Sequence, residues 1–306
     1  MDDTPFKLAM NWPLPRRRFL RFVMGGVLIL AICGMLIVGI PRQKEQSIAR
    51  RIVSRGGHVS FDYAGPDWIP QSVRNTVWWL NRISSVDAPG SAASPELLSD
   101  LETLTELKGL SIGSAQVTDV DLAHLKGLTH LKSLILDNSQ ITDVGLEHLT
   151  GLSNLTFLGF DNTQVTDAGL QHLQGLTHLE SLILASTKVT DAGLVHLKGF
   201  PNLTFLALNN TQITDAGLEH LKEFSNFTYL NLNNTQITDA GLKHLKGLNN
   251  LRGLVFDDTQ ITDAGLEHLK GLTNLGILSL ANTQVTAEGR AKLRQALPNS
   301  NIQPNP

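Results

Sequence analysis

The sequence predicts an α/β solenoid in which short parallel strands form one face and short helices form the other. A 24-residue unit, GLTHLKSLILDNSQITDVGLEHLT at 127–150, returns from 151, 175, 199, 223, 247 and 271. A fixed period of this length is typical of stacked coils. Within each unit, apolar residues first alternate and then recur at three-residue spacing, which indicates a strand followed by a helix. One unit cannot bury its apolar stripe alone, whereas stacked units bury it together.

We number each unit from the first leucine of its LxxLxL stretch. Position 1 then falls at Leu107, Leu131, Leu155, Leu179, Leu203, Phe227, Leu251 and Leu275. Positions 1, 4 and 6 are predicted to point inward, and the alternate residues of the strand outward. The Thr-Asp-x-Gly-Leu run at positions 12–16 predicts a helix N-cap. Leucines at positions 16, 19 and 22 form the helix stripe, and a glycine such as Gly175 ends it.

The consensus LxxLxLxxTxITDAGLxHLxxL resembles the leucine-rich repeat family. It is most similar to the bacterial, membrane-anchored proteins with Thr in the usual Asn or Cys place, and to internalin-like and F-box/LRR repeats. The resemblance implies a horseshoe with a parallel sheet on the concave face and short helices on the convex face. It is specific for fold but not for function, because the matching residues are those that build the coil.

The composition narrows the function classes. A formal net charge of −3 and 42% hydrophobic residues favour neither disorder nor nucleic-acid binding. The only cysteine, Cys33, excludes an intrachain disulfide and a cysteine-ligated zinc site.

The chain divides into six predicted segments. These are a basic N-terminal segment at 1–21, a transmembrane helix at 22–40, a juxtamembrane helix and N-terminal cap at 41–82, a degenerate repeat at 83–106, eight regular repeats at 107–297 and a C-terminal tail at 298–306.

Residues 22–40 predict a retained membrane anchor. This run of 19 uncharged residues would span roughly 28 Å as a helix, close to the thickness of a bilayer's hydrocarbon core. A cleaved signal peptide is the alternative, but the run is longer than the usual apolar region and no small-x-small site follows it.

Orientation is predicted from the arginines of 16–21. They resemble a twin-arginine export signal, although an ordinary basic segment is the alternative. Both interpretations predict a single-pass membrane protein. Its N-terminus would be cytoplasmic and its repeat domain periplasmic or extracellular.

Residues 41–55 predict a basic amphipathic helix. Its cations could contact anionic lipid headgroups, or the helix could be a solvated linker. The cations are Arg42, Lys44, Arg50, Arg51 and Arg55. Three of the four tryptophans follow within 68–79, where they could cover the first coil or form a membrane-interface belt.

The outward positions of the strands, 3, 5, 7 and 8, predict a protein-binding surface. Rigid aromatic side chains there would anchor a partner with little loss of rotamer freedom. The predicted binding residues are Phe157, Phe205, Tyr229, Asn209, Asn233, Asp161 and Asp257. The alternative is that the aromatic residues only cover neighbouring strands.

Metal binding and catalysis are not predicted. Seven histidines recur at position 18, from His124 to His268, but one histidine per coil does not bring four ligands together. No nucleophile elbow, P-loop, HExxH or dinucleotide motif occurs, so we expect neither an enzyme nor a cofactor.

The sequence therefore predicts a membrane-anchored repeat protein that binds another protein through its concave surface. Two alternatives remain: a structural or self-associating component of the cell envelope, and an adaptor that presents clients to an enzyme.

Overall fold

The structure is a computed structural model that describes residues 40–65, 67, 71–74, 81–114 and 116–303. The chain forms two compact units. The first comprises Met1–Ser47 with Tyr63–Asn81, and the second comprises Ile48–Asp62 with Arg82–Pro306. In the first unit, the described helix α3 (Gln71–Arg74) places the guanidinium carbon of Arg74 4.5 Å from the centre of the Tyr63 ring.

The second unit contains the repeats. Its strands are β1 (His58–Tyr63), β2 (Asn81–Asp87), β3 (Gly109–Ser111), β4 (Ser133–Ile135), β5 (Phe157–Gly159), β6 (Ser181–Ile183), β7 (Phe205–Ala207), β8 (Tyr229–Asn231), β9 (Gly253–Val255), β10 (Ile277–Ser279) and β11 (Asn301–Ile302). Its α-helices are α4 (Pro95–Leu101), α5 (Asp143–Leu146), α6 (Asp167–His172), α7 (Asp215–Leu221), α8 (Asp239–Leu242), α9 (Asp263–Leu266) and α10 (Ala287–Ala296). Helix α2 (Ile40–Ser54) has residues in both units. The 3-10 helices of the second unit are η3 (Gly90–Ala92), η4 (Asp119–Leu125), η5 (Glu147–Leu149), η6 (Gly193–Gly199) and η7 (Lys243–Leu245).

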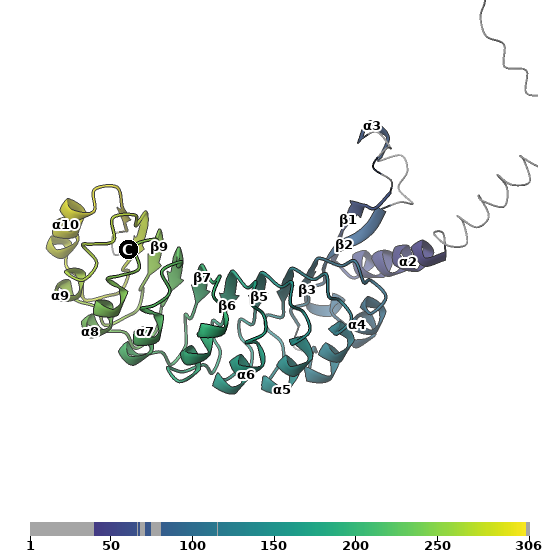
Figure 1. The fold of residues 1–306 in the computed structure, drawn as a ribbon, viewed down its shortest axis with the longest axis horizontal. Coiled ribbons are helices and arrows are strands. Elements are labelled where there is room, and N and C mark those ends of the chain that lie inside the picture. Colours follow the sequence, from purple (N-terminus) through teal and green to yellow (C-terminus); the bar gives the residue numbers. More distant parts are fainter. Residues whose placement is uncertain (1–39, 66, 68–70, 75–80, 115, 304–306) are drawn as a thin grey trace, which may run out of the picture. The chain divides into compact units, whose positions relative to one another are not determined.

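The predicted α/β solenoid with a parallel sheet is confirmed. The strands follow one another in sequence order across one sheet, and from β2 to β11 each pair is parallel. Position 4 stays in register from coil to coil, as in Leu206↔Leu230. Within this unit, the strands line the inner side of the curved stack and the helices line its outer side (Figure 1).

The core is the column of inward positions that the sequence predicts. Leu203, Leu206 and Leu208 from the strand side are fully buried, as are Leu218 and Leu221 from the helix side of the same coil. Where phenylalanine replaces leucine, at Phe160, Phe200, Phe227 and Phe256, the ring is also fully buried. The leucine stripe and the strand alternation are therefore sufficient to place the core.

An additional coil precedes the regular ones. Val86 of β2 is in register with Leu110 of β3, and Val86 is fully buried. On the helix side, α4 buries Leu98 and Leu101 and is capped by Ser94, whose hydroxyl accepts the Leu97 N–H. This coil keeps the core positions although it lacks the Thr-Asp signal.

Helix α2 covers the start of the repeat core. Ile48 and Ala49 each lie about one helical turn before Ile52, and all three belong to the hydrophobic core. The aromatic segment that the sequence suggests as a cap lies mostly outside the described residues, including all three tryptophans within 68–79.

The predicted transmembrane helix at 22–40 lies outside the described residues, except for Ile40 at the start of α2. Among the helices that the structure describes, none is both long and apolar enough to span a bilayer.

Candidate protein-binding surface

The recurring Thr-Asp-x-Gly residues join each coil to the next. In one coil Asp191 Oδ1 accepts the Thr214 N–H at 2.8 Å, and Asp191 Oδ2 accepts the Thr214 hydroxyl at 2.6 Å. Thr214 also caps α7, since its hydroxyl accepts the Ala216 N–H. The same two bonds join Asp119 to Thr142, Asp143 to Thr166, Asp167 to Thr190, Asp215 to Thr238, Asp239 to Thr262 and Asp263 to Thr286.

The glycine at position 15 makes room for this aspartate. A Cβ on Gly217 would lie 2.3 Å from Asp191 Oδ1, well inside contact distance. A Cβ on the corresponding glycine of each other coil would lie 2.0–2.5 Å from the equivalent aspartate Oδ1. The signature is therefore a joint between coils, which explains its recurrence without reference to a ligand.

Other recurring polar residues also have structural partners. The position 9 hydroxyl, as in Thr235, donates to the Leu232 carbonyl at 2.6 Å. Position 8 has a left-handed backbone, with φ 48° at Asn234, and its amide donates to Asn210 Oδ1 at 2.9 Å. Asparagine tolerates this conformation better than most residues. On the opposite edge, the position 24 amide of Asn250 donates to the Ser225 carbonyl at 2.8 Å.

Position 3, on the inner face of the sheet, is not occupied by one residue type. It holds Ser133, Phe157, Ser181, Phe205, Tyr229, Gly253 and Ile277. The two serines and three aromatic residues are half-buried, whereas Ile277 is 46% exposed. Sequence reasoning placed Ile277 in this row but did not select it, because its exposure depends on the small neighbour Gly253 and on its place at the end of the row.

Phe205 and Tyr229, which we name the aromatic pair, are in register on β7 and β8. Their ring centroids are 4.7 Å apart and the ring planes differ by 3°. The Tyr229 ring extends over Gly253, where a Cβ would lie 2.3 Å from Tyr229 Cδ2. The pair is thus fixed by its neighbours and presents a rigid apolar ridge.

Phe157 does not belong to this pair. It is in register with Ser181, which is in register with Phe205, so two strand spacings separate the phenylalanines. Parallel strands lie about 4.8 Å apart, so this separation is roughly 10 Å. The structure therefore brings together two of the three predicted aromatic residues.

The predicted polar residues at position 7 differ in their roles. Asp257 Oδ1 accepts the Ser279 hydroxyl at 2.6 Å and the Ala281 N–H at 2.7 Å. Asn233 Oδ1 accepts the Asp257 N–H at 2.8 Å. These two side chains therefore stabilise the coils whatever else they bind. Within the described residues, the side chains of Asp161 and Asn209 make no hydrogen bond.

Two groups on this face have shifted pKa values. Burial raises the pKa of Asp137, against the lowering effect of the bond from the Asp161 N–H, and the nearby Asp161 carboxylate raises it further. Burial also raises the pKa of the Tyr229 hydroxyl, and the Asp257 charge adds to this. The shifts show that the inner face combines partial burial with negative charge.

The position 18 histidines lie half-buried along the helix side. They contact neighbouring coils, as in the 3.0 Å contact of His196 Nδ1 with Gln174 Nε2. No group of three or more His, Cys, Asp or Glu side chains suited to a metal ion occurs in the part of the chain that the structure describes.

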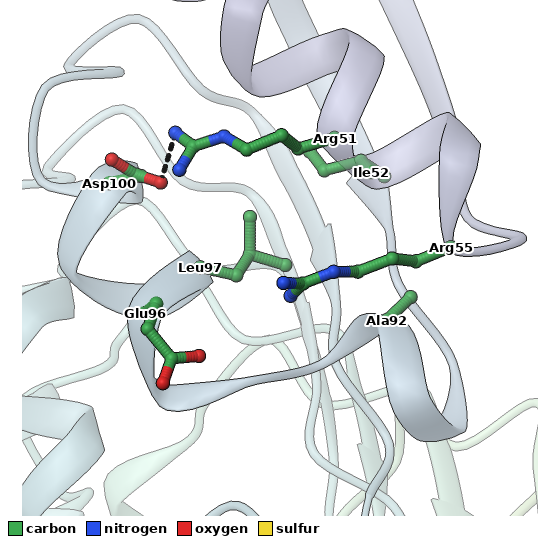
Figure 2. A pocket seen from close by; sticks show the side chains of 7 residues that line it. All are labelled: Arg51, Ile52, Arg55, Ala92, Glu96, Leu97 and Asp100. Atoms are coloured by element: carbon green, nitrogen blue, oxygen red, sulfur yellow. Dashed lines mark ion pairs between the residues drawn. The ribbon is translucent and has the colours of Figure 1, made fainter.

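Two of the cations predicted to contact lipid, Arg51 and Arg55, have partners in the coil at 83–106. Figure 2 shows Arg51 of α2 directed toward Asp100 of α4, with which it forms an ion pair. Arg55 donates to the Ser94 hydroxyl at 2.8 Å. The hollow that these residues line has a volume of about 20 Å³, room for one water molecule rather than a ligand. The contacts of Arg51 and Arg55 join α2 to this coil. Lys44 and Arg50 of the same helix are exposed.

Comparisons with known proteins agree with this geometry. A family model described as leucine-rich repeat matches residues 127–149, 175–197, 201–222 and 225–246. The matched segments are therefore leucine-rich repeats. No curated protein matches its sequence significantly.

Among solved structures, this leucine-rich repeat protein is similar to internalins of Listeria monocytogenes. One internalin (inlF) has 30% identity and a TM-score of 0.56, over 67% of this chain and 56% of that one. An internalin C2 (inlC2) has 29% identity and a TM-score of 0.53, over 65% of this chain and 81% of that one. The chain therefore spans about half the length of the first of these relatives.

Proposed function

We propose that this leucine-rich repeat protein binds a protein partner through the inner face of its sheet, with the aromatic pair at the centre. The recurring residues described above, at positions 8, 9, 12, 13, 15 and 24, have structural roles, whereas positions 3 and 5 vary from coil to coil. Rings that are already stacked lose little conformational freedom when a partner binds, so their burial contributes more fully to affinity.

The single observation that carries the proposal is the aromatic pair itself. Phe205 and Tyr229 are stacked yet only half-buried, and Ile277 extends the apolar row beyond Gly253. Aromatic side chains in this setting are the typical centre of an interface. Asp161 and Asn209 lie beside the row and are proposed to supply hydrogen bonds to the partner.

The test uses the purified full-length chain and a partner captured from its native cell extract. Phe205→Ala and Tyr229→Ala are each expected to weaken binding by about 1–3 kcal/mol. The matched control is Val195→Ala, because Val195 is 42% exposed on the helical side. If the Val195 variant loses binding and the aromatic variants keep it, the partner uses the helical side and the proposal is wrong.

We also propose that residues 22–40 anchor the chain in a membrane, with the N-terminus cytoplasmic and the repeats periplasmic or extracellular. The uncharged run supports the anchor, and the exposed Lys44 and Arg50 on α2 could contact anionic headgroups next to it. The protein should resist extraction by alkaline carbonate, and protease added outside intact cells should cleave the repeats. Release by carbonate would exclude the anchor, and protection from the protease would reverse the orientation.

A further inference from the structure

We infer that the segment bound on the inner face is cationic, with Lys or Arg side chains opposite a row of aspartates and an apolar side chain on the aromatic pair. This inference rests on the proposed function and names the chemistry of the partner. It follows from the distribution of charge over the inner face and its rim, considered coil by coil.

At positions 3, 5, 7 and 8 the inner face and its rim carry charge of one sign, whereas position 2, just before the strands, holds the exposed Lys108, Lys132 and Arg252. Positions 3, 5, 7 and 8 of the eight regular coils contain four carboxylates and no Lys, Arg or His. The carboxylates, which we name the aspartate rim, are Asp137, Asp161, Asp257 and Asp258. In the turn that follows position 8, the only basic residue of the eight regular coils is Lys188, at position 10. Its coil has no rim aspartate.

The rim carboxylates also lack cationic partners. Within the described residues, no Lys, Arg or His nitrogen lies within 4.0 Å of any of them. Exposed carboxylates of the helical side differ: Glu219 pairs with Lys222, Glu267 with Lys270 and Glu288 with Lys292. These three outer-side acids are thus neutralised by lysines three or four residues later in the chain, whereas the acids of the inner rim are not.

The environment of the rim strengthens this asymmetry. Asp137 is half-buried beside Asp161, and burial raises its pKa, so its ionised form is held at a cost that a nearby cation would offset. The Asp257 carboxylate accepts hydrogen bonds from Ser279 and Ala281, which fix its position without cancelling its charge. A fixed, uncancelled charge attracts a partner of opposite sign and selects against acidic ones.

The spacing relates the rim to the aromatic pair. Positions 7 and 8 follow position 3 by four and five residues, so the rim lies at most about 17 Å along the chain from the ridge. Asp257 is one coil beyond Tyr229, and its charge is felt at the Tyr229 hydroxyl, whose pKa burial and this charge together raise. One short partner segment can therefore place an apolar side chain on the pair and a cation at the rim.

A charge-neutralising variant can be made without changing shape. Asparagine occupies the equivalent positions of the preceding coil as Asn233 and Asn234, and Asn234 has the same left-handed backbone as Asp258. Asp257→Asn with Asp258→Asn therefore removes two charges and keeps an Oδ1 acceptor for the Ser279 and Ala281 donors, with loss of the long 3.4 Å bond that Asp257 Oδ2 accepts from Asn233 Nδ2. Glu219→Gln with Glu267→Gln is the matched control, because it removes two charges from the helical side.

The experiment selects phage-displayed random dodecapeptides on the full-length protein and then measures binding of the enriched peptides at low and high salt. Peptides rich in Lys or Arg together with an aromatic or aliphatic residue are expected. Rim neutralisation should weaken them by about 3- to 10-fold at low salt, and high salt should reduce that difference. The Glu219 and Glu267 control should leave their affinity unchanged.

Other outcomes separate the two proposals. Enriched peptides that depend on Phe205 and Tyr229 but are neutral or acidic would overturn the cationic inference and leave the proposed function intact. Cationic peptides whose binding is equally weakened by the helical-side control also overturn it. Peptides that bind regardless of Phe205→Ala and Tyr229→Ala contradict the proposed function itself.

Discussion

Replacing Gly217 by alanine tests whether the joint between coils explains the repeat signature. The new Cβ would lie 2.3 Å from Asp191 Oδ1 and 3.1 Å from Leu194 Cδ1. A carbon and an oxygen do not approach closer than about 3 Å without displacement, and the backbone of α7 cannot move away because its coil is stacked on both sides. The Asp191 carboxylate must therefore withdraw from Thr214.

The expected loss can be worked from the two bonds that Asp191 accepts, at 2.8 Å from the Thr214 N–H and 2.6 Å from its hydroxyl. A hydrogen bond to a charged group contributes about 1.5–3 kcal/mol, so losing both would cost roughly 3–6 kcal/mol. Alanine is favoured over glycine in a helix by about 1 kcal/mol, which offsets part of this loss. We expect the free energy of unfolding to fall by about 2–5 kcal/mol.

The assay is urea unfolding followed by circular dichroism, with Gly247→Ala as the control. Gly247 ends the helical side of the next coil, its φ is not positive, and no heavy atom lies within 4 Å of a Cβ placed there. This substitution should leave stability unchanged or raise it by up to about 1 kcal/mol.

Adding Gly217→Ala to Asp191→Ala should cost much less than Gly217→Ala alone, because the clashing carboxylate is gone. Two results would refute this role of Gly217. One is an equal loss of stability in Gly217→Ala and Gly247→Ala, and the other is that the losses from Gly217→Ala and Asp191→Ala add fully in the double variant.

Three further substitutions test other parts of the structure by the same unfolding assay. Asp137→Asn should stabilise the protein at pH 7, and the gain should vanish as the pH falls through the raised pKa of Asp137, because the wild-type carboxyl is then neutral. A constant gain at all pH values would contradict the burial of charge. Ile52→Ala should lower the free energy of unfolding by about 2–5 kcal/mol, and Val53→Ala, at an exposed neighbour, should lower it little. Equal small losses would show that α2 does not cap the core. Leu206→Ala should likewise cost about 2–5 kcal/mol and Asn210→Ala much less; similar small effects would contradict the register.

Most of the second unit could be predicted from the sequence because the repeat gives the same evidence many times. A single leucine such as Leu206 could be placed in many ways, but the same leucine at a 24-residue period has one consistent place in the core. Even the coil at 83–106, without the Thr-Asp signal, followed from the frame. Its core residue Val86 is fully buried and in register with Leu110.

The meaning of the polar signature could not be predicted in the same way. The sequence indicates that Thr214 caps a helix, but it does not show that Asp191, 23 residues earlier, accepts both Thr214 donors. That contact forms only when two coils stack, so it belongs to packing rather than to local sequence. The docking of α2 was missed for the same reason, since the basic residues Arg51 and Arg55 bind Asp100 and Ser94 across the first coil.

The candidate site was predicted in part, because outward direction follows from alternation but neighbour contact does not. Position 3 placed Phe157, Phe205 and Tyr229 in one row, yet only the adjacent pair stacks. A serine between Phe157 and Phe205 is enough to divide the row, whereas a glycine after Tyr229 lets its ring spread along the sheet.

The contrast between constant and variable positions then gives a rule for this chain. A residue that recurs in each coil with a bond to the next coil, as Asp191 has to Thr214, is explained by the stack. Phe205 and Tyr229 stand at a position whose residue type changes from coil to coil, and they contribute no bond that other coils need. Coils with Ser133 or Ser181 at the same position pair in the same register, so the stacking geometry does not need a large ring there. Their half-buried position on the inner face therefore supports the proposal that this face binds a partner.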